Sequence, residues 1–206
     1  MLPKEYLDRL IDENPALGST EECIWDIFET LRDSFASGGK LLLCGNGGSA
    51  ADCEHIVGEL MKGFLQKRPI PRKFASHPAL DGEGELLQGA LPAIALTGHF
   101  ALSTAFANDV DPAMVFAQQT YGYGRAGDAL LALSTSGNAQ NVHHALRVAR
   151  AIGMTTIGIT GASGGAMREL CDQCLCLPVT ETYRIQELTL PTYHALCAML
   201  ESTFFD

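Results

Sequence analysis

Short apolar runs alternate with longer amphipathic stretches along most of this 206-residue chain. Each run is too short for a buried helix, and most end in small residues, which is typical of a strand buried on both faces. The longer stretches repeat apolar positions every three or four residues, as a helix with one buried face does. Strands are therefore expected at 40–44, 93–96, 128–134, 155–160 and 173–177.

Helices are expected around these strands, at 4–14, about 19–38, 49–64, 101–108, 112–123, 139–152 and 182–204. Strands that alternate with helices indicate a parallel sheet covered on both faces. The predicted fold is an α/β three-layer α-β-α sandwich with extra N-terminal helices. Right-handed crossovers then place the loops that follow the strands along one edge of the sheet.

Two segments carry more specific local signals. Ser19-x-x-Glu22 resembles a capping box at the start of the second helix. Residues 66–91 hold three prolines and a soft acidic stretch, which predicts a loop or flap with at most a short helix. We expect one domain over 1–206, with a helical extension at about 1–38 and the flap inserted at 66–91.

Two glycine- and hydroxyl-rich loops each lie between a predicted strand and a predicted helix. One is Cys44-Gly-Asn-Gly-Gly-Ser49, and the other is Ser134-Thr-Ser-Gly-Asn138. Free backbone N–H groups and the positive end of the helix dipole hold anions at such places. The alternative is an ordinary capped helix start without a ligand, since Ser, Thr and Asn are the usual caps. Two such loops at corresponding strand ends favour a small molecule that carries a phosphate.

Charge and composition narrow the classes of ligand. A formal net charge of −10 argues against a nucleic-acid-binding surface, which would be basic. The first loop lacks the Gly-x-Gly-x-x-Gly spacing of dinucleotide-binding folds, and no Gly-Lys-Ser/Thr follows it, so no nucleotide cofactor is expected. No apolar run approaches the roughly 18–20 residues that span a bilayer, so no membrane association is expected. The first ten residues lack a signal-like apolar core, and a cytoplasmic location is expected.

Side chains suited to acid–base chemistry recur on two predicted helices. His55 and Glu59 are spaced i, i+4, so an imidazole and a carboxylate could share a metal or a substrate. A solvent-facing pair of this kind is common and, taken alone, is the better interpretation. Gln186 and His194 would lie about 12 Å apart along a straight last helix. One ion reaches both only if the side chains lean together or if two chains supply ligands, which suggests a site at a subunit interface.

These residues belong to a longer series of segments that occur in order over residues 17–205. The segments are Cys44–Ser49, His55-x-x-x-Glu59, Ala107-Asn-Asp109, Ser134–Asn138, 161–165, and Arg184-Ile-Gln-Glu187 with His194. In this series the chain strongly resembles the sugar isomerase (SIS) domain family and, within it, the phosphoheptose isomerases. The resemblance implies a five-stranded parallel sheet of flavodoxin-like type without a nucleotide. It also implies a homotetramer with active sites between subunits.

The resemblance further implies a reaction and the residues that carry it. Sedoheptulose 7-phosphate would become D-glycero-D-manno-heptose 7-phosphate through an enediol, with Glu59 as the catalytic base and His194 as its acid–base partner. The positions that hold zinc in metal-containing members are His55, Glu59, Gln186 and His194. The positions matching substrate contacts are Asn46, Gly47, Gly48, Ser49, Asp109, Ser134, Thr135, Ser136, Asn138 and Gln186. Glutamate coordination to zinc would lower its basicity, so the carboxylate role is the firmer of the two.

Two departures from the family pattern bear on the identity of the sugar. Ala139 stands where many isomerases have another serine, and residues 72–88 look like an insertion. One rival interpretation is a non-catalytic SIS-domain tetramer that acts as a binding or regulatory partner, like the replication initiator-associating protein. Such proteins typically lack the residues that match Glu59 and His194, and this chain keeps both. Another is an isomerase of a different ketose phosphate.

Overall fold

The apolar runs form one parallel sheet in the computed structural model, which describes residues 1–205. The strands are β1 (Leu41–Gly45), β2 (Ala93–Ala95), β3 (Ala129–Leu133), β4 (Thr155–Thr160) and β5 (Gln173–Cys176). Their order in the sheet is β2-β1-β3-β4-β5, and every neighbouring pair is parallel. The predicted α/β class and five-stranded parallel sheet are confirmed.

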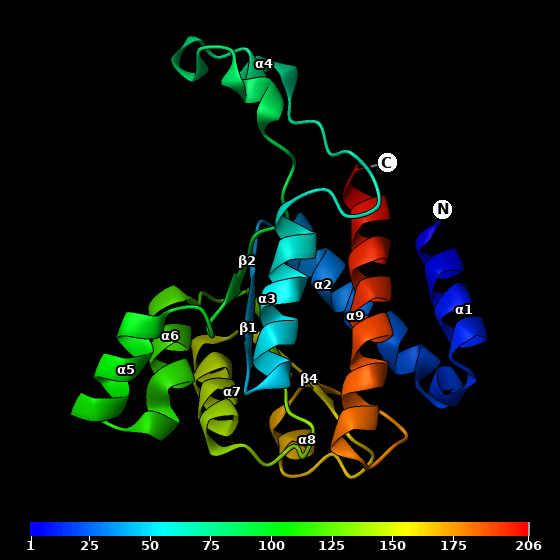
Figure 1. The fold of residues 1–206 in the computed structure, drawn as a ribbon, viewed down its shortest axis with the longest axis vertical. Coiled ribbons are helices and arrows are strands. Elements are labelled where there is room, and N and C mark those ends of the chain that lie inside the picture. The colour runs from blue at the N-terminus through cyan, green and yellow to red at the C-terminus, as the bar shows by residue number, and fades with distance from the viewer. Residues whose placement is uncertain (206) are drawn as a thin grey trace.

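Helices cover both faces of the sheet (Figure 1). One face carries α2 (Glu21–Ala36), α3 (Gly48–Met61) and α9 (Thr182–Phe205), with α1 (Pro3–Glu13) packed against α9. The other face carries α6 (Val115–Tyr123), α7 (Gln140–Ile152) and α8 (Met167–Leu170), and α5 (Phe100–Asp109) lies beside α6. The predicted three-layer arrangement is confirmed.

The alternation of side chains along each strand produces two separate cores. Leu41 and Leu43 of β1 join the core under α1, α2, α3 and α9. Leu42 and Cys44 point the other way and join the core under α6, α7 and α8. Because every residue of β1 is buried, the strand reads as a continuous apolar run rather than an alternating one.

Helix α2 begins differently from the predicted capping box. A 3-10 helix over Pro15–Thr20 precedes it, and Ser19 lies inside this turn instead of capping α2. The actual N-cap, Thr20, has helical backbone angles, and its hydroxyl donates to the Leu17 carbonyl oxygen at 2.7 Å. The prediction was wrong because a cap needs an extended residue, and the chain here stays helical up to α2.

The predicted flap extends away from the body of the molecule (Figure 1). It contains α4 (Arg72–Ala75) and two 3-10 turns at Pro78–Leu80 and Glu83–Leu86. Outside the flap, a further 3-10 turn at Pro112–Met114 precedes α6. The base of the flap is closed by an antiparallel bridge between Pro69 and Gln88.

Helix α9 runs without a break through Pro191 and carries both Gln186 and His194. Two threonine hydroxyls of this helix donate to backbone carbonyls one turn earlier, Thr189 to Ile185 and Thr192 to Leu188. None of the helices in residues 1–205 combines the length and the apolar character that crossing a membrane requires.

Candidate active site

The two predicted loops meet at the carboxyl edge of the sheet and form a pocket of about 340 Å³. One wall is the turn between β1 and α3, the second is the turn between β3 and α7, and the third is the first turn of α9. The residues that line this loop pocket are Asn46, Gly47, Gly48, Ser49, Leu133, Ser134, Thr135, Ser136, Ala139, Thr182 and Gln186. The parallel pairing of β1 with β3 brings the two turns together, because it aligns the ends of the two strands.

Two glycines let the first loop take this shape. Gly47 has φ +57°, a left-handed conformation that side chains rarely adopt. A Cβ atom at Gly48 would collide with the side-chain amide of Gln186. Glycine at position 48 therefore lets α9 lay Gln186 against the start of α3.

Hydroxyl groups face this pocket with their hydrogen-bonding capacity unused. Ser49 and Ser134 are buried, and within residues 1–205 neither their hydroxyls nor that of Thr135 bonds to another protein group. Ser136 differs, because its Oγ accepts from the Asn138 backbone N–H at 3.2 Å. These hydroxyls and the first N–H groups of α3 and α7 are donors of the kind that hold a phosphate.

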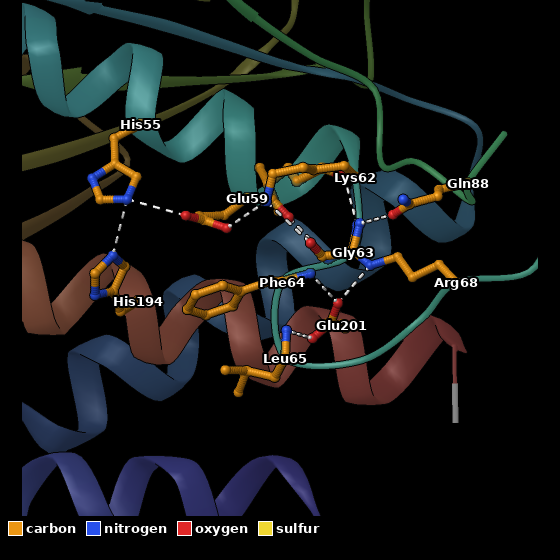
Figure 2. A network of polar contacts seen from close by, with 11 residues as sticks. His55, Glu59, Lys62, Gly63, Phe64, Leu65, Arg68, Gln88, His194 and Glu201 are labelled. Atoms are coloured by element: carbon orange, nitrogen blue, oxygen red, sulfur yellow. Dashed lines mark hydrogen bonds and ion pairs between the residues drawn. The ribbon is translucent and has the colours of Figure 1, made fainter. Parts of the chain in front are cut away.

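A second group of polar side chains lies further along α3 and α9. His55 and Glu59 come from α3 and His194 comes from α9, and one potential ligand atom of each lies within 4.8 Å of the others. His55 Nε2 is 3.1 Å from Glu59 Oε1 and 3.4 Å from His194 Nε2 (Figure 2). These three residues are called the His–Glu cluster below. The i, i+4 spacing left open whether His55 and Glu59 face solvent or a site, and in the structure this pair faces α9.

The environment of the cluster favours neutral imidazole at His194. Burial lowers the pKa of His194, and the nearby His55 lowers it further, while Glu59 acts in the opposite direction. The Glu59 side chain is only 13% exposed, and Lys62 Nζ lies 3.4 Å from its Oε2. A shielded carboxylate beside a neutral imidazole is a suitable pair for moving a proton.

Two further side chains support the cluster from behind. The Tyr193 hydroxyl lies 2.9 Å from His55 Nδ1 and 3.3 Å from Asp52 Oδ1. Burial raises the pKa of Tyr193 well above its ordinary value, and burial also raises the pKa of Asp52, which the Tyr193 hydrogen bond partly offsets. Sequence reasoning missed both residues. Asp52 is three positions before His55 on α3, a spacing that places it on the same face.

Comparison with known proteins connects this geometry to a family. Residues 16–87 and 82–161 match the SIS domain family. A phosphoheptose isomerase from Roseiflexus sp. is 42% identical over 180 residues, which cover 87% of this chain and 81% of that protein. The chain belongs to the SIS domain family. Its relatives place it among the phosphoheptose isomerases, and another, from Rhodospirillum rubrum, is 38% identical over 90% of this chain and 88% of its own length.

Solved structures agree with this placement in the SIS family. Phosphoheptose isomerase GmhA from Neisseria gonorrhoeae superimposes with a TM-score of 0.76 at 32% identity, over 95% of this chain and 93% of that one. A phosphoheptose isomerase from Francisella tularensis also gives a TM-score of 0.76, at 28% identity over 97% and 96% of the two chains. Both superpositions extend over nearly the whole of this chain.

The remaining predicted site residues of this SIS-domain chain lie in different places. Gln186 lies about two helical turns before His194 and lines the loop pocket. Asn138 shapes the second loop, where its side-chain oxygen accepts from the Ala166 N–H at 3.0 Å. Asp109 is exposed at the end of α5, where it accepts from the Asn108 side chain. Within this chain Asp109 lines neither the loop pocket nor the cluster.

A buried ion pair holds the C-terminal end of α3. Arg68 Nε lies 2.7 Å from Glu201 Oε1, and both side chains are at most 2% exposed. Arg68 also donates to the backbone carbonyls of Leu60 and Glu59, which the end of a helix leaves without partners. We call this pair the Arg68–Glu201 clasp. Helix α3 ends at Met61 rather than at the predicted 64, because Lys62 is extended, and the Arg68 side chain then satisfies carbonyls of the last turn.

Proposed function

We propose that this chain is a phosphosugar aldose–ketose isomerase that converts sedoheptulose 7-phosphate into D-glycero-D-manno-heptose 7-phosphate. One observation carries the proposal: helices α3 and α9 contribute to both the loop pocket and the His–Glu cluster. Ser49 and Glu59 lie about 15 Å apart along α3, a span that an open-chain seven-carbon phosphate bridges once the side chains reach inward. Membership of the phosphoheptose isomerase group supports this substrate.

The reaction follows from placing the phosphate in the loop pocket and C1 and C2 at the cluster. Glu59 removes a proton from C1 of the ketose, and the electron pair moves through C1–C2 onto the C2 carbonyl oxygen to give an enediolate. His194 moves a proton between the two oxygens, so that the C1 oxygen becomes the carbonyl. Glu59, whose acidic proton exchanges with solvent, then delivers a proton to C2. The substrate and the product contain the same atoms, and no external oxidant is needed.

The His–Glu cluster also has the donor set of a zinc site. Two imidazole nitrogens and a carboxylate oxygen are usual zinc ligands, and a tetrahedral site with bonds of about 2.0–2.1 Å has ligand–ligand distances of about 3.3 Å. Two of the separations, 3.1 Å and 3.4 Å, are close to this distance, and all three ligand atoms lie within 4.8 Å of one another. Zinc bound there would stabilise negative charge on the enediolate oxygens. Within this chain His55, Glu59 and His194 would hold the ion, whereas the side-chain amide of Gln186 lies against Gly48.

We also propose a homotetramer with active sites between subunits. Helix α5 buries none of its residues within this chain, although it is rich in apolar side chains. Phe100 of this helix is 80% exposed, Val110 directly after it is 66% exposed, and Tyr121 of α6 is 70% exposed. An exposed apolar surface of this kind is typical of a subunit interface. Packing against a second copy would allow the exposed Asp109 to serve the neighbouring site, and light scattering on the purified protein tests the stoichiometry.

A cytoplasmic location follows from the proposed chemistry. The substrate is a phosphorylated intermediate, and all seven cysteines, which lie within the described residues, are free thiols. Free thiols are typical of a reducing compartment.

Steady-state turnover tests the proposed function. The purified chain is mixed with sedoheptulose 7-phosphate, and formation of the aldose phosphate is followed with and without added zinc. Parallel assays with fructose 6-phosphate and ribulose 5-phosphate test the choice of sugar. Turnover of the heptulose phosphate that is lost in Glu59→Gln and His194→Ala supports the proposal. Absence of turnover with every ketose phosphate, with or without zinc, contradicts it and favours a non-catalytic binding partner.

A further inference from the structure

Tyr193 occupies a position that the isomerase chemistry does not use. Its side chain is 1% exposed, yet it ends in a hydroxyl group that lies between two polar residues of α3. The hydroxyl is 2.9 Å from His55 Nδ1 and 3.3 Å from Asp52 Oδ1. A buried hydroxyl needs hydrogen-bond partners, and these two atoms are the ones within reach.

The number of hydrogen atoms decides the direction of both bonds. A phenol has one hydrogen to donate, whereas an ionised carboxylate can only accept. The Tyr193 hydroxyl therefore donates to Asp52, and its oxygen is left to accept from His55. That second bond requires a hydrogen on His55 Nδ1. In the neutral ring, Nε2 then carries a lone pair and no hydrogen.

The free lone pair points into the His–Glu cluster. His55 Nε2 lies 3.1 Å from Glu59 Oε1 and 3.4 Å from His194 Nε2. A nitrogen lone pair and a carboxylate oxygen at this distance repel each other unless a proton or a metal ion lies between them, and in this tautomer the ring proton is on Nδ1. The tautomer set by Tyr193 is therefore the one that a metal ion at the cluster needs.

Ring packing around Tyr193 supports the same arrangement. Its ring meets the His55 ring edge-on, with centroids 5.5 Å apart at 73°, and it meets the His194 ring at 4.9 Å and 82°. One aromatic side chain thus orients both imidazoles of the cluster. A phenylalanine would keep these ring contacts and remove only the hydroxyl.

We propose that Tyr193 is a positioning residue whose hydroxyl, held by Asp52, fixes His55 in the tautomer protonated on Nδ1 and keeps Nε2 free as a ligand. The proposal rests on the metal-bearing isomerase site described above. It predicts a property of the metal-free protein, however, so it can fail or succeed independently of turnover.

The test is the tautomer of His55 in metal-free protein labelled with ¹⁵N-histidine. Long-range ¹H–¹⁵N spectra distinguish the protonated ring nitrogen from the bare one, and His55→Gln assigns the signals by removing them. Wild-type protein should show a proton on Nδ1. Tyr193→Phe should give a mixture of tautomers and weaken zinc binding about 10- to 100-fold, as measured by competition with a chromogenic chelator.

Asp52→Ala is the sharper variant, because alanine is compatible with the middle of α3 and leaves the phenol in place. Without the carboxylate, the hydroxyl should donate to His55 Nδ1 and move the imidazole proton to Nε2. Tyr183→Phe removes a hydroxyl from a 63% exposed tyrosine of the same helix and is the matched control, with no expected change in either measurement.

Three results would overturn the positioning role. These are a wild-type His55 protonated on Nε2, unchanged zinc affinity in Tyr193→Phe, or an Asp52→Ala protein that keeps the wild-type tautomer. The expected tautomers in a protein that turns over no ketose phosphate would instead contradict the proposed reaction and leave the positioning role standing.

Discussion

The loop pocket and the His–Glu cluster share two helices, but their parts come from the chain in different ways. Most of the loop pocket comes from two continuous segments, 46–49 and 133–139, which follow β1 and β3. The cluster joins His55 and Glu59 to His194, which lies 139 residues beyond His55 in the sequence. Two contacts hold the cluster in place and are called its supports below: Tyr193 with His55, and Arg68 with Glu201. The paired residues are 138 and 133 positions apart in the sequence. The pocket is thus mainly a product of local sequence, and the cluster is a product of tertiary packing.

This difference predicts how each region responds to mutation. Changes in the loop pocket remove one donor among several, so substrate affinity should decline in steps. Changes at the cluster remove a group with no substitute, so the chemical step should fail. Changes in the supports should act on stability before they act on chemistry.

Glu59→Gln should have the largest effect. The amide cannot accept the C1 proton, so kcat should fall by about 10²- to 10⁴-fold. KM for sedoheptulose 7-phosphate should change little, because the loop pocket is intact. Initial rates across a substrate series give both constants, and circular dichroism checks the fold. A variant that keeps more than a small fraction of wild-type kcat would remove Glu59 from the role of base.

Arg68→Leu should come next, and it should act on stability. It leaves the Glu201 carboxylate buried without its charged partner, with only the Phe64 and Leu65 N–H groups still donating to it, and the free energy of unfolding should fall by about 3–5 kcal/mol. Urea denaturation measures this change. The matched control is Arg9→Leu, which breaks an exposed ion pair with Glu13 and should cost no more than about 1 kcal/mol. Equal losses in the two variants would show that the clasp is no more important than a surface pair.

Ser134→Ala should have a smaller effect, confined to binding. The variant removes one hydroxyl from the loop pocket, and a hydrogen bond to a charged group contributes about 1.5–3 kcal/mol. KM should therefore rise by about 10- to 100-fold while kcat stays near its wild-type value. Ser76→Ala is the matched control, because Ser76 is exposed on the flap and its hydroxyl donates to the Arg72 carbonyl. A fall in kcat with unchanged KM in Ser134→Ala would place the phosphate elsewhere.

Ala139→Ser should have the smallest effect, and it should be favourable. Ala139 is the N-cap of α7, makes no side-chain cap hydrogen bond and lines the loop pocket. A serine can cap the helix, which typically contributes about 1 kcal/mol, and can offer its hydroxyl to the phosphate when substrate is bound. Thermal unfolding should therefore show a higher Tm, and KM should fall. A variant with lower Tm and higher KM would show that the pocket is already complete without this hydroxyl.

The parts of the structure that depend on local pattern could be predicted from the sequence. The five strands come from apolar runs that are too short to form buried helices. The two loops carry residues typical of an anion site. The predicted capping box at the start of α2 was wrong, because a residue such as Ser19 suits a 3-10 turn as well as an extended N-cap. The spacing of apolar residues along the chain does not distinguish a 3-10 turn from an extended N-cap.

The supports of the cluster could not be predicted, because their partners are far apart in sequence. Arg68 lies in a proline-rich stretch, where a charged side chain normally indicates solvent, yet it is buried against Glu201. Tyr193 has the spacing of an ordinary core residue on α9, and only the fold shows that its hydroxyl reaches His55. Sequence similarity to the SIS family indicated the reacting residues, but the contacts that hold them had to come from the structure.

The most direct test of the central claim, that one substrate joins the loop pocket to the His–Glu cluster, is proton NMR of the reaction in deuterated water. Sedoheptulose 7-phosphate is incubated with the enzyme, and the aldose product is examined at C2. The account predicts deuterium at C2 with wild-type protein and none with Glu59→Gln. An aldose that forms without solvent deuterium at C2 in any molecule, or that forms equally with Glu59→Gln, would contradict it.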